Sequence, residues 1–198
     1  EMLLLDPVPA VAAIDIPIGL TETGPRECDQ RARRLLGRPR SSSVFPAPVR
    51  PMLKAATYAR ACSIGRRADG RRINRETWNI VPKIAEVDAF LGAHREMRRR
   101  FHEAHPEVSF WKLNSCSAMA YGKKTRQGRA ERRAIVASRF ARYDAVRETL
   151  PRGGWAEDDL LDAFAVLWTA KRVARGAAAA APSDAPADRL GLPMKIVY

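Results

Sequence analysis

Apolar residues along the chain follow two patterns, one typical of strands and one typical of helices. Residues 10–16 form a short apolar run that Asp15 interrupts and that ends at a proline and a glycine, which predicts a buried strand. Residues 105–113 alternate apolar and polar side chains and predict a second strand. The tail, residues 194–198, predicts an edge strand.

Helical spacing dominates the rest of the chain. Apolar positions three and four apart, bounded by glycine and proline, predict helices over 26–36, 52–62, 80–101, 130–150 and 157–175, and polar, basic residues predict a loop over 63–75. Strands that alternate with helices indicate an α/β fold. Because stable sheets usually have more than two strands and a tail, we expect further strands upstream of residue 1.

Length and charge narrow the class of protein. The chain has 198 residues, 46% hydrophobic and 29% charged, which predicts one globular domain and excludes disorder for its bulk. Its 35 Lys and Arg outnumber 22 Asp and Glu, for a net charge of +13. We expect a polyanionic partner, most simply nucleic acid; the alternative is a solvated basic surface.

Cysteine spacing and hydropathy bear on the cellular compartment in which the protein works. The three cysteines are far apart in the sequence and form no CxxC pair, which favours reduced thiols in a cytoplasmic protein. No apolar run reaches the roughly 18 residues that a membrane span needs, so we expect no membrane partner.

The most informative acids lie in the helix predicted over 157–175. Asp159 and Asp162 share one face of a helix that is apolar nearly all round and is therefore expected to be buried. Buried carboxylates need a cationic or hydrogen-bonding partner, and Mg²⁺ is a suitable one. Capping of the helix N-terminus would explain Asp159, but not Asp162, which lies almost one turn further along.

Two further acids are candidates for the same chemistry. Asp15 lies near the carboxyl end of the first predicted strand, where open α/β sheets bind ligands, although an Asx turn would also explain it. Glu107 opens the second predicted strand, and the spacing His102-x-x-His105-x-Glu107 is one that a metal cluster could use. That cluster is disfavoured because His102 is expected to end the preceding helix.

A basic segment at 122–129 is the candidate for phosphate contacts. Its glycines flank Lys123, Lys124 and Arg126, and such residues suit contacts to phosphate oxygens. The spacing differs from GxxxxGK[ST], which argues against a Walker nucleotide site. A solvated basic face is the alternative.

Six of these segments together resemble a known family. In chain order they read AIDIPIGL, GPRECDQRARRLLGRPRSSSVFPAPVR, HPEVSFWKL, GKKTRQGRAER, DDLLDAFAVLWTA and GLPMKIVY. This series is similar to the domain-of-unknown-function 429 family, whose members are regarded as predicted RNase H-like nucleases. The D-x-x-D-A helix also resembles the last catalytic helix of RuvC-type Holliday-junction resolvases.

The resemblance implies a fold and a nuclease site. It implies one RNase H-like domain over 1–198, a mixed sheet flanked by helices, with a largely helical insertion at 21–103. It implies a metal-dependent nuclease whose cofactor is a pair of Mg²⁺ or Mn²⁺ ions, with Asp15, Asp159 and Asp162 as metal ligands and catalytic residues, Glu107 as a further catalytic acid, and Lys123, Lys124 and Arg126 on the phosphates.

The front of the chain departs from the family pattern. Members usually begin with a strand that carries a Gly-Val-Asp-Gly-like motif, and we expect this strand and its catalytic Asp to be missing here. Catalysis by these 198 residues alone is therefore open. The alternatives are a nucleic-acid-binding protein of the same fold without catalysis and, on fold analogy alone, a phosphotransferase.

Overall fold

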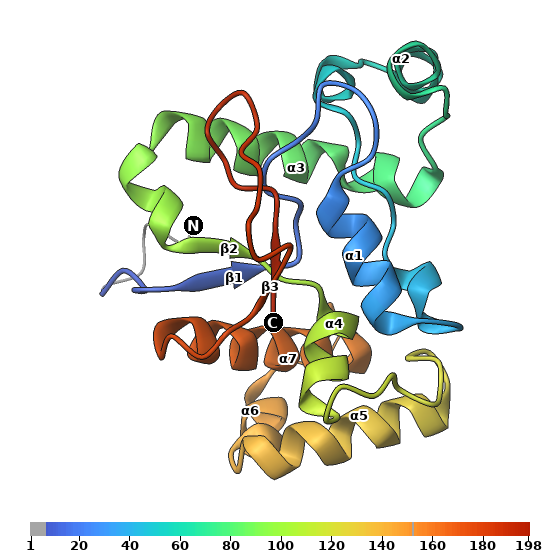
Figure 1. Ribbon diagram of the computed structural model, residues 1–198. Coiled ribbons are helices and arrows are strands. Elements are labelled where there is room, and N and C mark those ends of the chain that lie inside the picture. The colour runs from blue at the N-terminus through green and yellow to red at the C-terminus, as the bar shows by residue number, and fades with distance from the viewer. Residues whose placement is uncertain (1–6, 152) are drawn as a thin grey trace.

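Short strands and longer helices make up an α/β structure in the computed structural model, which describes residues 7–151 and 153–198 (Figure 1). The α-helices, in chain order, are α1 (Glu27–Leu36), α2 (Tyr58–Asp69), α3 (Arg75–Ala93), α4 (Pro106–Leu113), α5 (Arg126–Arg139), α6 (Tyr143–Thr149) and α7 (Glu157–Ala174). The strands are β1 (Ala12–Ile14), β2 (Phe101–Glu103), β3 (Ala180–Ala181) and β4 (Ile196–Val197). Within the described residues, no helix combines the length and apolar composition that a membrane crossing needs.

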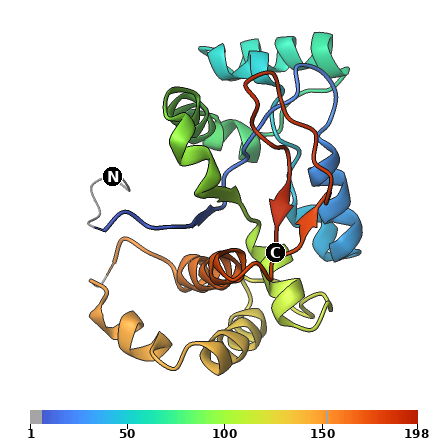
Figure 2. The ribbon, with the colours of Figure 1, turned by 60° about the vertical axis from the view of Figure 1, so that its left-hand side comes forward.

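β1 and β2 form a parallel pair between two helices. Alternate side chains of β1 enter different apolar clusters: Ile14 packs with Leu91 of α3, and Ala13 packs with Val166 of α7. The helices α3 and α7 therefore cover opposite faces of the pair, as both ribbon views show (Figures 1 and 2). This layering places the carboxyl end of β1 close to α7.

The C-terminal strand extends the pair on the side of β2. Ala104 forms a parallel bridge to Val197, and β4 pairs antiparallel with β3. The predicted strand in the C-terminal tail is therefore confirmed over two residues, but its predicted place at an edge is wrong, because β4 has a partner on each side. The predicted first strand is also confirmed, over Ala12–Ile14.

A buried ion cluster fixes the chain after β1. Arg26 donates hydrogen bonds to Glu103 (2.7 Å) and Asp29 (2.5 Å), and the Ile18 amide donates to the other oxygen of Glu103 (2.7 Å). Arg26 also donates to the carbonyls of Ile18 and Gly19. Since each buried charge has a partner of opposite charge, the cluster holds the segment after Asp15 against β2 and α1.

The predicted strand over residues 105–113 is wrong, because these residues form helix α4. Pro106 occupies the first turn, where its missing N–H costs nothing. The polar positions of the alternating pattern are buried too: Ser109 hydrogen-bonds Thr169 of α7 at 2.8 Å. Alternation predicts a strand when the polar side chains face solvent. Here the polar side chains are buried as well, so the pattern did not indicate a strand.

The predicted helix over 80–101 has different ends. Asn74 caps α3 by accepting a hydrogen bond from the Thr77 amide at 2.8 Å, so the helix starts at Arg75. It ends at Ala93, and residues 101–103 are β2 instead. The structured region 21–103 thus carries α1, α2 and α3 but ends on a strand of the sheet.

Two other predicted helices need new bounds. The prediction over 52–62 is displaced because Thr57 caps α2, which runs on through most of the segment predicted as a loop. The prediction over 130–150 divides into α5 and α6, since Phe140 and Tyr143 both turn inward against the ring of Phe164. The helices predicted over 26–36 and 157–175 are confirmed as α1 and α7.

Candidate functional site

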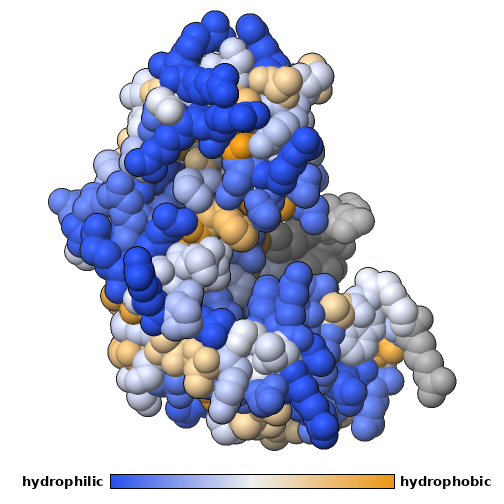
Figure 3. Space-filling model, turned by 90° about the vertical axis from the view of Figure 1, so that its right-hand side faces the viewer, coloured by the Kyte–Doolittle hydropathy of each residue, from blue (hydrophilic) through white to orange (hydrophobic). Residues whose placement is uncertain are grey.

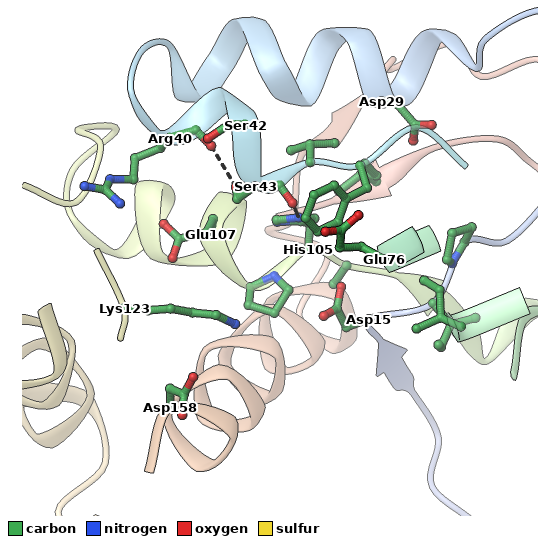
Figure 4. Close-up of a pocket in the computed structure, with 18 of the residues that line it drawn as sticks. Asp15, Asp29, Arg40, Ser42, Ser43, Glu76, His105, Glu107, Lys123 and Asp158 are labelled. Atoms are coloured by element: carbon green, nitrogen blue, oxygen red, sulfur yellow. Dashed lines mark hydrogen bonds between the residues drawn. The ribbon is translucent and has the colours of Figure 1, made fainter. Parts of the chain in front are cut away.

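A cavity of about 880 Å³ opens beside the carboxyl end of β1 (Figure 4). Its walls come from the segments around β1, α4, α5, the N-terminus of α7 and the 39–45 segment. Five of the seven residues predicted to act in catalysis, metal binding or phosphate binding line it: Asp15, Glu107, Lys123, Lys124 and Asp159.

Asp15 follows β1 directly and is exposed to the cavity. The surrounding protein removes water from this carboxyl and raises its pKa, while the nearby charges of His105 and Lys123 lower it in part. In Figure 4 the side chain of Lys123 extends toward Asp15 from the opposite wall. Asp15 is thus a solvent-reachable acid in a protein-enclosed setting.

Asp162 lies deeper, on α7, and forms an ion pair with Lys123. The Lys123 Nζ donates to Asp162 Oδ2 at 2.6 Å, and the Asp162 side chain is 13% exposed. Burial raises the pKa of Asp162 to about 6, the charges of Asp15 and Glu107 add to the rise, and Lys123 opposes it. Acids from two other segments of the chain therefore act electrostatically on Asp162.

Lys123 is the cation that lies among Asp15, Asp158 and Asp162. Burial lowers the pKa of Lys123, but the carboxylates of Asp162, Asp158 and Asp15 outweigh this effect and raise it. The ammonium group therefore stays charged throughout the physiological range. It supplies the positive charge that clustered buried carboxylates require.

Glu107 is held by a buried arginine of α5. The Arg132 Nη2 donates to Glu107 Oε1 at 2.5 Å, and Arg132 is fully buried. The same guanidinium group donates to the carbonyls of Tyr121 (3.0 Å) and Gly128 (3.1 Å). Arg132 thereby joins α4 to the loop that carries Lys123.

The sequence of that loop explains its fixed position. Thr125 accepts a hydrogen bond from the Gly128 amide at 3.0 Å, which caps α5, and donates one to the Gly122 carbonyl at 2.8 Å. A side chain at Gly128 would place its Cβ 2.0 Å from the Gly122 oxygen, so glycine is required there. Glu131 accepts hydrogen bonds from the amides of Ala120 and Tyr121.

The sequence model of the family described as protein of unknown function (DUF429) matches residues 1–187. The chain belongs to this family. The resemblance drawn from the motifs is thereby confirmed. A search of curated proteins and a search of solved structures each found no match.

Two predicted site residues of this DUF429 protein lie apart from the three acids. Asp159 lines the cavity but is exposed, and within the described residues its carboxylate has no salt-bridge or hydrogen-bond partner. Arg126 is exposed at the start of α5 and does not line the cavity. Of the two histidines in the His102-x-x-His105-x-Glu107 spacing, only His105 lines the cavity.

Sequence reasoning missed the opposite wall of the cavity. Arg40 lines it and donates to the carbonyls of Met119 (3.0 Å) and Ala120 (3.1 Å), next to the Lys123 loop. Phe45 also lines it and is 45% exposed. The sequence feature that pointed to this wall was the apolar pair Val44 and Phe45 within a Pro- and Ser-rich segment. That pair indicated that the segment packs against the protein, but not that it lines a binding site.

The acids were tested for their fit to a divalent metal ion. Within residues 7–151 and 153–198, no group of three or more Asp, Glu, His or Cys side chains is spaced to hold an ion. However, Asp162 Oδ1 and Glu107 Oε2 are buried without hydrogen-bond partners, and carboxylate oxygens are the ligands that Mg²⁺ and Mn²⁺ accept. The donor atoms are therefore of a suitable kind, although their spacing here forms no ion site: Lys123 neutralises Asp162, and Arg132 neutralises Glu107.

Proposed function

We propose that this DUF429 protein is a metal-dependent nuclease with an RNase H-like site that hydrolyses phosphodiester bonds of nucleic acid. One observation carries the proposal: Asp15 after β1 and Asp162 on α7 act on Lys123 beside a large cavity, and Glu107 on α4 acts on Asp162 from the same side. Acids at the end of a strand and on a late helix are the arrangement that the family resemblance implies. The protein raises the pKa of Asp15 and of Asp162, so their ionised forms are costly, and functional sites are where such costs occur.

Asp15, Glu107 and Asp162 would hold Mg²⁺ or Mn²⁺. Such an ion would polarise a phosphoryl oxygen and activate water for attack on phosphorus. This set places Glu107 where the resemblance implied Asp159, because Asp15 and Glu107, and not Asp159, are the acids that raise the pKa of Asp162. The unpartnered oxygens of Glu107 and Asp162 are the acceptors that this role needs.

The chain's own cations would position the substrate. Lys123 would exchange the Asp162 carboxylate for a substrate phosphate, which frees Asp162 and leaves the ammonium paired with an anion. Lys124 and Arg40 line the same cavity and would contact neighbouring phosphates. Nucleic acid binding and ion binding would therefore support each other.

Cleavage by matched acid variants tests this proposal. Labelled single- and double-stranded DNA and RNA are incubated with Mn²⁺ and the wild-type, Asp15→Asn, Asp162→Asn or Asp159→Asn protein. We expect the first two variants to lose about 100-fold or more of the cleavage rate, since even outer ligand partners affect metal sites by about 10–100-fold. Asp159→Asn, on the same helix but exposed, should stay within a few-fold of wild type.

Full activity of Asp162→Asn would overturn the proposal. A binding protein without catalysis is the second candidate, and the ion pair between Lys123 and Asp162 favours it, because this pair satisfies one of the buried acids without any metal. Saturable nucleic acid binding by the wild type, with no cleavage in Mg²⁺ or Mn²⁺, would identify that candidate.

A further inference from the structure

The basic segment predicted to bind phosphate is largely neutralised by its own neighbours. Lys123 pairs with Asp162, Arg132 with Glu107, and Arg133 with Asp144 at 2.5 Å, while Arg129 lies 3.8 Å from Glu157. These pairs cancel most of the positive charge between residues 122 and 133. Most of the net charge of +13 must therefore lie outside this segment.

One concentration of this charge lies on α2 and on the turn that leads into α3. Six exposed arginines, here called the arginine patch, occupy this region: Arg60, Arg66, Arg67, Arg71, Arg72 and Arg75. Within the described residues, none of the six forms a salt bridge, and Asp69 and Glu76 are the acids of the stretch 58–76. Figure 3 shows strongly hydrophilic residues over the top of the molecule, at the level of α2 in Figure 1.

The backbone beneath the arginine patch is fixed by specific contacts. The Tyr58 hydroxyl donates to the Ile73 carbonyl at 3.0 Å, and the Arg75 guanidinium lies 3.9 Å from the centre of the Tyr58 ring. Gly65 lets the chain return closely, because a Cβ there would lie 2.5 Å from the Arg71 carbonyl oxygen. The arginines are therefore displayed from a packed turn, and binding would order little more than their side chains.

The patch adjoins the wall of the large cavity. Phe45 lines that cavity, and the next residues, 46–49, line a hollow of about 130 Å³ together with Arg71 and Arg72. Glu76, which follows Arg75 on α3, lines the large cavity as well. A chain of phosphates that leaves the cavity past Phe45 would reach the patch.

We propose that the arginine patch is a second nucleic-acid-binding surface, which holds the sugar-phosphate backbone without reading its sequence. Guanidinium groups bind phosphate through paired N–H donors, and clustered arginines without acidic partners carry this affinity at low cost. Nucleic acid as the polyanion rests on the proposed function, whereas the position of the surface rests on the charges alone. The patch would hold the substrate while the acids of the cavity act on it.

Measuring nucleic acid binding without metal tests the arginine patch independently of cleavage. Affinity for a labelled DNA duplex is measured in EDTA over a series of NaCl concentrations for the wild type and for Arg66→Gln/Arg67→Gln/Arg71→Gln/Arg72→Gln. Each lost phosphate contact removes about 0.9 from the slope of log K against log salt, so we expect the slope to flatten by about three to four units. The corresponding Arg→Lys variant keeps the charge and should keep most of the slope.

A control variant removes the same charge elsewhere. Arg34, Arg139, Arg142 and Arg175 are exposed arginines outside the patch and outside the cavity lining, and their fourfold change to Gln should flatten the slope by less than about one unit. Equal slopes for the two Gln variants would overturn the proposal, as would binding of the wild type to anionic vesicles but not to DNA or RNA. Because this measurement contains no metal, its result does not depend on whether the acid variants lose cleavage. If the wild type cleaves nucleic acid but the fourfold Gln variant of the patch keeps the wild-type slope, the arginine patch is refuted and the proposed function stands.

Discussion

Lys123 stabilises the ionised form of Asp162, whereas burial and two nearby acids destabilise it. Its carboxyl is largely buried and lies near two other acids, and its pKa rises from 3.8 to about 6. A shift of this size corresponds to a cost on the order of 3 kcal/mol when the group is ionised. The native state therefore holds the proton of Asp162 more tightly than the unfolded chain does.

Asp162→Asn should stabilise the metal-free protein at neutral pH. Because the native pKa lies above the unfolded value, the favourable contribution of protonated Asp162 is complete below about pH 4 and lost as the pH rises through about 6. Asparagine resembles the protonated acid, so the variant should match wild type near pH 4 and exceed its free energy of unfolding by about 1–3 kcal/mol at pH 7.5. Urea denaturation in EDTA at both pH values measures the difference.

Asp159→Asn serves as the control for that measurement. Asp159 lies almost one turn earlier on α7 and is exposed, so its change should leave stability within about 0.5 kcal/mol at both pH values. A lower stability of Asp162→Asn at pH 7.5 would mean that the ion pair with Lys123 outweighs the cost of burial.

The loop before α5 is the element that determines the position of Lys123. Its backbone closes on itself through Thr125 and Gly128, and Arg132 and Glu131 attach it to the helix and to α4. Most of its hydrogen bonds join residues within a dozen positions of one another. The loop and the start of α5 therefore form one local unit that presents Lys123 to the acids.

Gly128→Ala should disrupt this unit. The added Cβ would lie 2.0 Å from the Gly122 carbonyl oxygen, so the loop must move, at a cost of about 1–3 kcal/mol or more in the free energy of unfolding. Gly92→Ala is the matched control, because Gly92 lies in α3 with no atom within 4 Å of its Cβ, and alanine should gain about 0.5–1 kcal/mol there. Urea denaturation measures the free energy of unfolding of both variants. Changes of the same sign in the two variants would contradict this account of the loop.

Local patterns predicted some elements and failed at others for a physical reason. The helices α1 and α7 and the strand β1 follow from the spacing of apolar residues in their own segments. The strand β2 was missed because Glu103 reads as a surface residue, and its burial depends on Arg26, far away in the sequence. Such long-range pairs leave no periodic signal.

The candidate site shows the same division. Asp15 and Asp162 were singled out because each is an acid in an otherwise apolar element, and this conflict is visible in the sequence. The pairing of Lys123 with Asp162, and of Glu107 with Arg132, depends on how α5 packs beside α4 and α7. Nothing in the spacing of residues gives that packing.

At the scale of the whole molecule, the fold brings the acids and the basic surfaces to one side of β1. Open α/β sheets bind ligands beyond the carboxyl ends of their strands, and the cavity lies at that end of β1. The helix α7 supplies an acid from below the strand pair, and the segment 39–45 supplies the facing wall (Figures 1 and 4). The arginine patch on α2 adjoins that wall and extends the basic surface beyond the cavity.

Anomalous scattering from a crystal grown with Mn²⁺ and a non-hydrolysable oligonucleotide tests the central claim most directly. The account predicts a manganese peak within roughly 2.0–2.6 Å of carboxylate oxygens of Asp15 and Asp162, with the Lys123 ammonium moved from Asp162 to a phosphate. A cavity without a peak, in which Lys123 still contacts Asp162 while the oligonucleotide is bound, would contradict it.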